Sequence, residues 1–165
     1  MRFPLVTAAL LALVGGAYLL SRAGWPVPTR DWLEWTVLFR PLVEQGQWWR
    51  LASFHFMHAD AEHLLANASS LFFLGLILES RVGHAAYLGL VLLAMLASTA
   101  FSWFLLPDSP TLGASGIGYG LLGGFLVALP LWRWRVDRRA ALRELRTAAF
   151  LLAVYTAWNW GDRQS

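Results

Sequence analysis

The 165-residue sequence contains no cysteine and no lysine, since all thirteen of its basic residues are arginines. The absence of cysteine excludes disulfides, thiol nucleophiles and thiolate metal ligands, and it leaves the redox compartment open. The absence of lysine excludes a serine–lysine catalytic pair within the chain. Charged residues make up only 14% of the chain and the formal net charge is +3. This balance argues against nucleic acid as a partner and favours anionic lipid.

Apolar residues are present in great excess. Hydrophobic residues make up 58% of the chain, ten of them tryptophans, and this content is far above that of a soluble domain of this size. Five apolar segments are long enough, or nearly so, to cross a bilayer: 3–20, 61–78, 85–106, 112–132 and 147–160. We predict an all-α, polytopic membrane helix bundle of about five transmembrane helices, forming a single domain over residues 1–165. A cleaved signal peptide at the first segment is the alternative, but no small-x-small cleavage site follows it.

The distribution of arginine predicts the orientation of the chain. Six arginines lie between Arg133 and Arg146, in the connection between the fourth and fifth segments, and such clusters remain cytoplasmic. The N-terminus is then cytoplasmic as well, and the long connection 21–60 faces outward. This connection is rich in aromatic residues, which predicts that it lies in the membrane interface. We expect a multi-pass protein of a bacterial inner membrane.

The stretch TLGASGIGYGLLGGF, residues 111–125, raises the question of what Ser115 does. Ser115 falls in the first turn of the fourth span, where backbone N–H groups and the helix dipole favour a developing oxyanion. In the alternative interpretation, Gly116, Gly120 and Gly124 form a face of small residues that lets another helix approach closely. Ser115 is then one more small residue. The stretch by itself leaves both interpretations open.

Polar residues at the start of the second span favour the catalytic interpretation. His63 and Asn67 lie four residues apart and therefore share one helical face, and His58 precedes His63 by five residues. Polar side chains at membrane depth require partners or water. We therefore expect an aqueous cavity at this place.

A wider set of residues resembles the rhomboid family of intramembrane serine proteases. The order and spacing match over roughly residues 1–160, in a combination far more specific than the serine motif alone. The matching residues are Trp49-Arg50, His58, His63-Leu64-Leu65-x-Asn67, Gly75, Glu79-x-Arg81-x-Gly83 and Gly113-Ala114-Ser115-Gly116 followed by Tyr119.

The resemblance implies a role for each of these residues. Ser115 is expected to be the nucleophile, supported by Gly113 and Gly116, and His63 and Asn67 are expected to donate hydrogen bonds to the oxyanion. Tyr119 is expected to pack against the general base, and His58 to support the site. Trp49 and Arg50 are expected to belong to the outer interfacial loop, and Glu79 and Arg81 to join the cytoplasmic ends of helices. The family has a six-helix core, needs no metal or cofactor, and cleaves single-span transmembrane proteins near the outer membrane face.

One element of the family pattern is not present in the sequence. The family's general base is a histidine in a Gly-rich motif on a sixth span, and none of the four histidines fits that position. Without a base the serine hydroxyl is a weak nucleophile. Three interpretations follow: a protease truncated before its last helix, a non-catalytic rhomboid-like protein that binds membrane helices, or a metal site. The metal site would use His55, His58 and His63 with Asp60 and Glu62, although this spacing matches no usual pair of helical histidine ligands.

Overall fold

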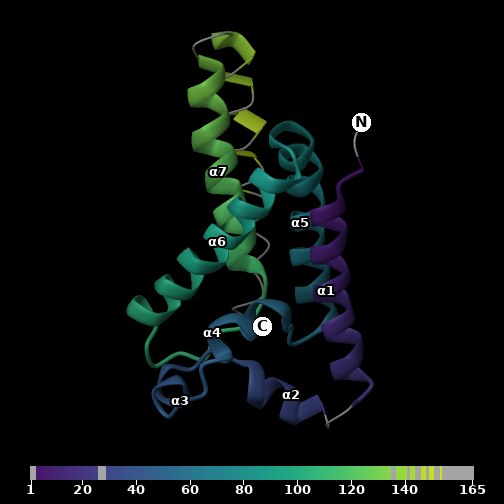
Figure 1. The fold of residues 1–165 in the computed structure, drawn as a ribbon, viewed down its shortest axis with the longest axis vertical. Coiled ribbons are helices and arrows are strands. Elements are labelled where there is room, and N and C mark those ends of the chain that lie inside the picture. Colours follow the sequence, from purple (N-terminus) through teal and green to yellow (C-terminus); the bar gives the residue numbers. More distant parts are fainter. Residues whose placement is uncertain are drawn as a thin grey trace.

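The computed structural model describes residues 3–25, 29–134, 137–140, 142–143, 146–147, 149–150 and 153. Within these ranges the regular structure is helical, apart from an isolated antiparallel bridge between Leu38 and Thr111. Figure 1 shows α1 beside α5, and α6 crossing α7. The four long helices are α1 (Leu5–Arg22), α5 (Ala61–Val82), α6 (His84–Leu105) and α7 (Ser115–Trp134). The all-α fold predicted from the sequence is confirmed.

The long helices follow the predicted spans closely. Helices α1, α5 and α6 are long and apolar enough to cross a membrane, and α7 has 20 residues. Helix α5 includes the polar start of its predicted segment and continues to Val82. The expected span at 147–160 lies largely outside the described residues. The protein is therefore an integral membrane protein with several membrane-spanning helices.

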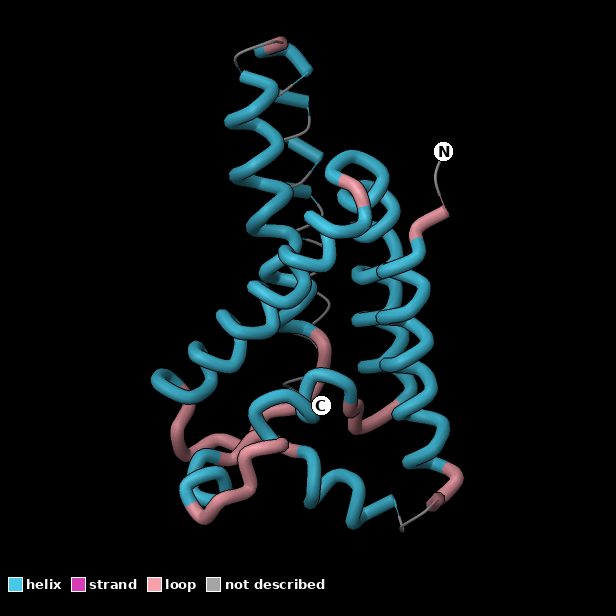
Figure 2. The backbone as a smooth tube through the Cα atoms, viewed as in Figure 1, coloured by secondary structure: helices cyan, strands magenta, loops and turns pink. Residues whose placement is uncertain are grey.

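The connection between α1 and α5 folds into short helices. These are α2 (Thr29–Thr36), α3 (Arg40–Glu44), α4 (Arg50–Ser53) and the 3₁₀ turn η1 (Phe54–Phe56). Figure 2 shows them lying across one end of the bundle, joined by short loops. Trp48 and Trp49 on this connection are largely exposed, which agrees with the predicted interfacial segment.

The core lies between the four long helices, which all contribute to it. Outward-facing positions are also apolar, as Leu96 and Phe104 on α6 illustrate with exposed fractions of 69% and 73%. Such exposure on a helix is expected where lipid replaces water as the solvent. The buried apolar residues of the core are Leu10, Val14, Leu71, Leu74, Leu78, Tyr87, Val91, Ala94, Ala114, Ile117, Leu121, Leu122 and Phe125.

A buried carboxylate joins three of the helices at one end of the bundle. Glu79, 2% exposed, accepts hydrogen bonds from the backbone N–H groups of Val6 (2.8 Å) and Thr7 (2.9 Å). The Thr7 hydroxyl donates to the same carboxylate at 2.6 Å, and Nδ1 of His84 lies 2.6 Å from Oε1. The first turn of α1 has no side-chain cap of its own, so Glu79 of α5 satisfies N–H groups that a helix leaves unpaired at its start.

A turn at Gly83 and a contact of Arg81 lie at the same end of the helix bundle as Glu79. Gly83, with φ +84°, ends α5 and begins α6, in a backbone conformation that favours glycine. The Arg81 guanidinium lies over the ring of Phe125 on α7, 5.8 Å from its centroid. The junction of helix ends that the resemblance implied at Glu79 and Arg81 is thus confirmed.

The glycine face of α7 packs against α6. A Cβ atom added to Gly116 would overlap Ser98, and one added to Gly120 would overlap Ala94. The close approach expected from these glycines is confirmed. The resemblance implied that the family's sixth span packs on this face, and that expectation is wrong, because the partner is α6. The spacing of glycines along one helix shows that another helix can pack closely, but it does not show which helix that is.

We predict that Gly75→Ala destabilises the protein, because a Cβ atom at Gly75 would overlap Thr7, whose hydroxyl bonds Glu79. The expected loss is about 1–3 kcal/mol, measured by thermal unfolding in detergent. Gly89→Ala on α6 is the matched control, because its Cβ meets nothing within 4 Å. The control should leave stability unchanged or raise it by up to about 1 kcal/mol. Equal effects of the two substitutions would contradict the α1–α5 packing described here.

Candidate active site

Ser115 is the first residue of α7. The residue before it, Ala114, is fully buried, and its carbonyl accepts the Gly118 N–H at 3.1 Å, which closes the first turn. The N–H groups of a first helical turn have no carbonyl partner within their own helix, and they carry the positive end of the dipole. The predicted position of Ser115 in the first turn is therefore confirmed.

Gly113 holds the chain in a conformation that other residues rarely adopt, with φ +110°. Its N–H donates to the Phe54 carbonyl at 2.8 Å. A Cβ atom at Gly113 would lie 2.8 Å from Cε1 and Nε2 of His63 and 3.8 Å from Nδ2 of Asn67. Glycine is thus required here by backbone conformation and by contact with the neighbouring helix.

His63 and Asn67 face the turn that leads into Ser115, as the contacts of Gly113 show. Helix α5 begins after Asp60, whose side chain accepts the His63 N–H at 2.7 Å, an N-cap that sets the direction of the first turn. Asn67 is fully buried and donates from Nδ2 to the His63 carbonyl at 3.0 Å. The structure therefore places His63 and Asn67 beside Gly113, two residues before Ser115.

Three backbone attachments hold the start of α7 against the connection between α1 and α5. Leu38 and Thr111 exchange two N–H to carbonyl bonds of 2.9 Å each. The bond from Gly113 to Phe54 is the second attachment, and the third joins the Ala114 N–H to Nε2 of His58, with 3.4 Å between the nitrogens. The position of Ser115 thus depends on a segment more than fifty residues away in the sequence.

Arg50 holds this connection in shape from within. It is 3% exposed and donates to the carbonyls of Glu34 (2.6 Å) and Val37 (2.7 Å) and to the Gln47 side chain (2.8 Å). A guanidinium presents several donors in a fixed plane, which suits it to bind several acceptors at once. The neighbouring Trp49 donates from its indole to the Trp35 carbonyl at 2.9 Å. Both residues organise the interfacial loop, as the resemblance implied.

His58 is buried beside His63, the two rings meeting edge to face with centroids 5.0 Å apart. Burial, followed by the neighbouring His63, lowers the pKa of His58 from 6.5 to about 4, against smaller opposing effects of the Phe56 backbone and of Asp60. The imidazole is therefore neutral at neutral pH. A neutral ring has one nitrogen that accepts, and here Nε2 faces the Ala114 N–H.

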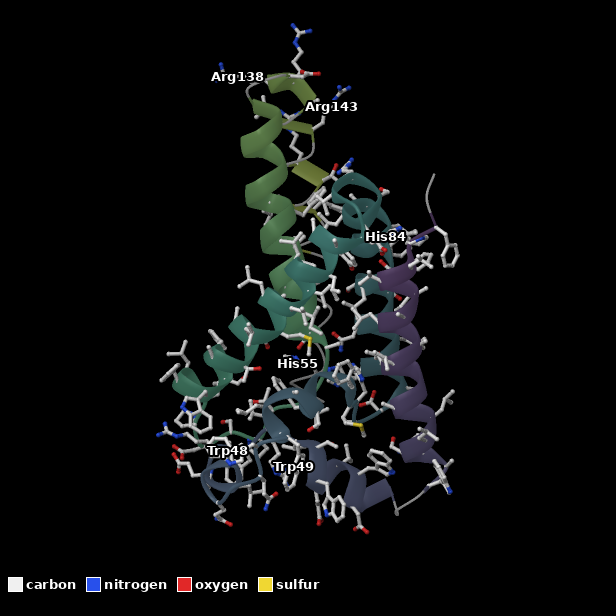
Figure 3. The ribbon with its side chains drawn as sticks, in the orientation of Figure 1. Trp48, Trp49, His55, His84, Arg138 and Arg143 are labelled. Atoms are coloured by element: carbon white, nitrogen blue, oxygen red, sulfur yellow. The ribbon has the colours of Figure 1, made fainter. Side chains whose placement is uncertain are left out.

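The sequence suggested no role for His55 other than as a metal ligand. Its Nε2 bonds the Thr99 hydroxyl on α6 at 3.1 Å, and burial lowers its pKa to about 4. Figure 3 shows His55 between Trp48 and Trp49 at one end and His84 toward the other. Because His55 turns to α6, it does not join His58 and His63, and among the described residues no group of three potential ligands gathers around one point. The proposed metal site is not formed.

Comparison with known proteins identifies the family. Residues 45–162 match the family model described as a Rhomboid domain. The chain belongs to the rhomboid family. It is 37% identical to RHOMBOID-like protein 2 of Arabidopsis thaliana over 126 residues, covering 76% of this chain and 38% of that protein. It is 29% identical to Rhomboid protease GluP of Bacillus subtilis over 138 residues, covering 83% of this chain and 26% of that protein.

Rhomboid relatives of this chain include a protein named as inactive. The chain is 24% identical to Inactive RHOMBOID-like protein 8 of Arabidopsis thaliana over 118 residues, covering 69% of this chain and 34% of that protein. The rhomboid chain described here thus spans between 26% and 38% of the length of these three relatives. The family therefore contains serine proteases and members without that activity.

We predict that the stability of this rhomboid falls as the pH is lowered from about 6.5 to about 4, the interval between the ordinary pKa and the folded-state pKa of His55 and His58. In this interval the unfolded chain binds protons that the folded chain excludes, at a cost of about 1.4 kcal/mol per pH unit for each histidine. Above this interval both states are neutral, and below it both are charged.

The measurement is the midpoint of thermal unfolding in detergent between pH 4 and pH 7. The double variant His55→Gln/His58→Gln should show a flatter dependence, because glutamine does not titrate. A wild-type midpoint that does not change with pH would contradict the burial of neutral histidines.

Proposed function

We propose that this rhomboid chain forms the nucleophile and oxyanion part of an intramembrane serine protease site. Ser115 acts as the nucleophile, and His63, Asn67 and the N–H of Ser115 stabilise the oxyanion of the tetrahedral intermediate. The observation that carries the proposal is the contact of His63 and Asn67 with Gly113, two residues before the serine at the start of a helix.

The general base is to be supplied by a further helix. His55 bonds Thr99, His58 bonds Ala114, and His84 bonds Glu79 at the far end of α5. These three histidines have other partners, and His63 is assigned to the oxyanion.

The face of α7 that would receive the further helix is adjacent to the one that α6 occupies. Tyr119 lies one turn after Ser115 and is 39% exposed. One turn further, a Cβ atom at Gly123 would meet none of the described residues within 4 Å. A helix that carries the base and packs over Tyr119 and Gly123 would reach Ser115 from this side. Small residues such as Gly123 permit close approach of two membrane helices.

The proposed substrate is a single-span transmembrane protein, cleaved near the outer membrane face. The lipid bilayer is the other partner, contacted through exposed apolar side chains of the long helices. Nucleic acid has no role in this proposal, and neither has a metal ion, because a serine nucleophile, a general base and oxyanion donors together suffice for acyl transfer.

We expect residues 1–165 to show no Ser115-dependent cleavage of a model transmembrane substrate in detergent. Cleavage should appear when a rhomboid sixth helix with an Ala-His motif is joined after Trp160. Ser115→Ala should then abolish it, and Asn67→Ala should lower the rate by about 10²- to 10³-fold as one oxyanion donor is lost.

Two leucine substitutions test where the added helix packs. Gly123→Leu should remove the gained activity by blocking close approach, while Gly89→Leu, at a similarly open position on α6, should not. If the extended chain folds and yet neither cleaves several substrates nor reacts with a fluorophosphonate, the protease proposal fails. The non-catalytic, helix-binding function then becomes the better account, in keeping with the relative named as inactive.

We further propose that the N-terminus is cytoplasmic in a bacterial inner membrane. Figure 3 shows Arg138 and Arg143 toward the same end as His84, and Trp48 and Trp49 at the opposite end. Arginine-rich ends remain in the cytoplasm. Reporter fusions should therefore place Arg138 inside and Gln45 outside. The reverse result would invert the orientation and place Ser115 near the cytoplasmic face.

A further inference from the structure

His58 lies at the one point where the α1–α5 connection meets the residue that precedes the serine. It is 1% exposed, its Nε2 lies 3.4 Å from the Ala114 nitrogen, and its ring contacts the ring of His63. It therefore touches the backbone that leads to the nucleophile and one of the two side-chain donors. We infer that His58 is a positioning residue, which caps the N-terminus of α7 and thereby fixes the orientation of Ser115 and His63.

A helix leaves the N–H groups at its start without partners inside the helix. Ala114 is the N-cap of α7, because its carbonyl accepts the first bond of the helix from Gly118. In a capping box, a side chain three residues into the helix accepts the N–H of the N-cap residue. In α7 that position is Ile117, which has no acceptor. His58 accepts the N–H instead, from a different segment of the chain.

This cap determines which N–H groups face the proposed oxyanion. With the Ala114 N–H directed to His58 and the Gly113 N–H directed to Phe54, the two peptide groups before the helix have fixed orientations. The Ser115 N–H is the next donor along the chain. Its direction is set by these two attachments together with the helical turn that follows.

The neighbouring histidine is positioned by the same group. The His63 ring meets the ring of His58 edge to face and lies where a Cβ atom of Gly113 would be, so the volume and orientation of His58 limit its rotation. A displacement of about 1 Å in a catalytic group can lower the rate by about 10²-fold. The significance of this role for catalysis rests on the proposed protease function, whereas the capping itself does not.

Capping by His58 can be tested without enzymatic activity. An Nε2 that accepts a hydrogen bond requires the proton on Nδ1, and ¹⁵N NMR of histidine-labelled protein in detergent distinguishes the two tautomers. We expect the Nδ1–H tautomer for His58. The Nε2–H tautomer would overturn the inference.

Hydrogen exchange at Ala114 gives the second measurement. His58→Leu should accelerate exchange of the Ala114 N–H by about fivefold relative to that of Gly118, the ratio expected for one lost hydrogen bond. His58→Gln, which restores an acceptor, should bring the ratio back toward the wild-type value. His55→Leu is the matched control, since His55 is equally buried but bonds Thr99, and it should leave the ratio unchanged.

The pH dependence of the same ratio separates capping from packing. His58 accepts only while neutral. Burial and His63 lower its pKa to about 4, opposed by the Phe56 backbone and by Asp60. In the wild-type protein, the Ala114 N–H should therefore be protected from hydrogen exchange at pH 6. This protection should be lost as the pH falls through about 4. The Gln variant should show no such loss.

The outcomes distinguish this inference from the proposed function. Unchanged exchange in His58→Leu, or an equal change in His55→Leu, would overturn the capping role whatever the activity of the protein. If the capping results hold while Ser115 fails to react with a fluorophosphonate even after a base-bearing helix is supplied, the protease proposal fails and His58 remains the cap of α7.

Discussion

The arrangement of the helices depends on the hydrogen bonds that the Glu79 carboxylate accepts. Within a bilayer, backbone N–H groups that lack partners are costly, because no water is available to replace them. Glu79 accepts two such groups from the first turn of α1 together with the Thr7 hydroxyl. The same carboxylate contacts His84 at the start of α6. The buried Glu79 carboxylate therefore joins α1, α5 and α6. Gly75 has no side chain, and this lets Thr7 come close enough to bond Glu79.

At the opposite end of the bundle, other groups accept hydrogen bonds from the N–H groups at the helix starts. Helix α5 is capped by its own Asp60, whereas α7 receives the Ala114 N–H bond from His58 on the α1–α5 connection. Arg50 in turn holds that connection by bonds to its carbonyl groups. The serine, its two neighbouring donors and the interfacial loop thus form one structural unit. Rigid support of this kind is what a site that stabilises a transient charge requires.

The packing of α7 explains how a rhomboid site can be arranged around a single helix. Gly116 and Gly120 face α6, which fixes the rotation of α7 about its axis. Ser115 and Tyr119 are consequently directed to a neighbouring face. The proposed nucleophile lies on α7 and the proposed oxyanion donors lie on α5, so on this proposal a base from a further helix would complete the site without rearranging the core.

The sequence by itself determined the fold class and the positions of the four long helices that the structure describes, and it predicted the candidate site residues. Apolar segments near 20 residues long predict membrane helices, and the four-residue interval from His63 to Asn67 places both on one face, because helical geometry acts over such short distances. Only the tertiary structure decided that Gly116 and Gly120 face α6, that His55 turns to Thr99, and that His58 caps α7. Contacts between distant segments depend on the rotation and crossing of whole helices, which no local spacing encodes.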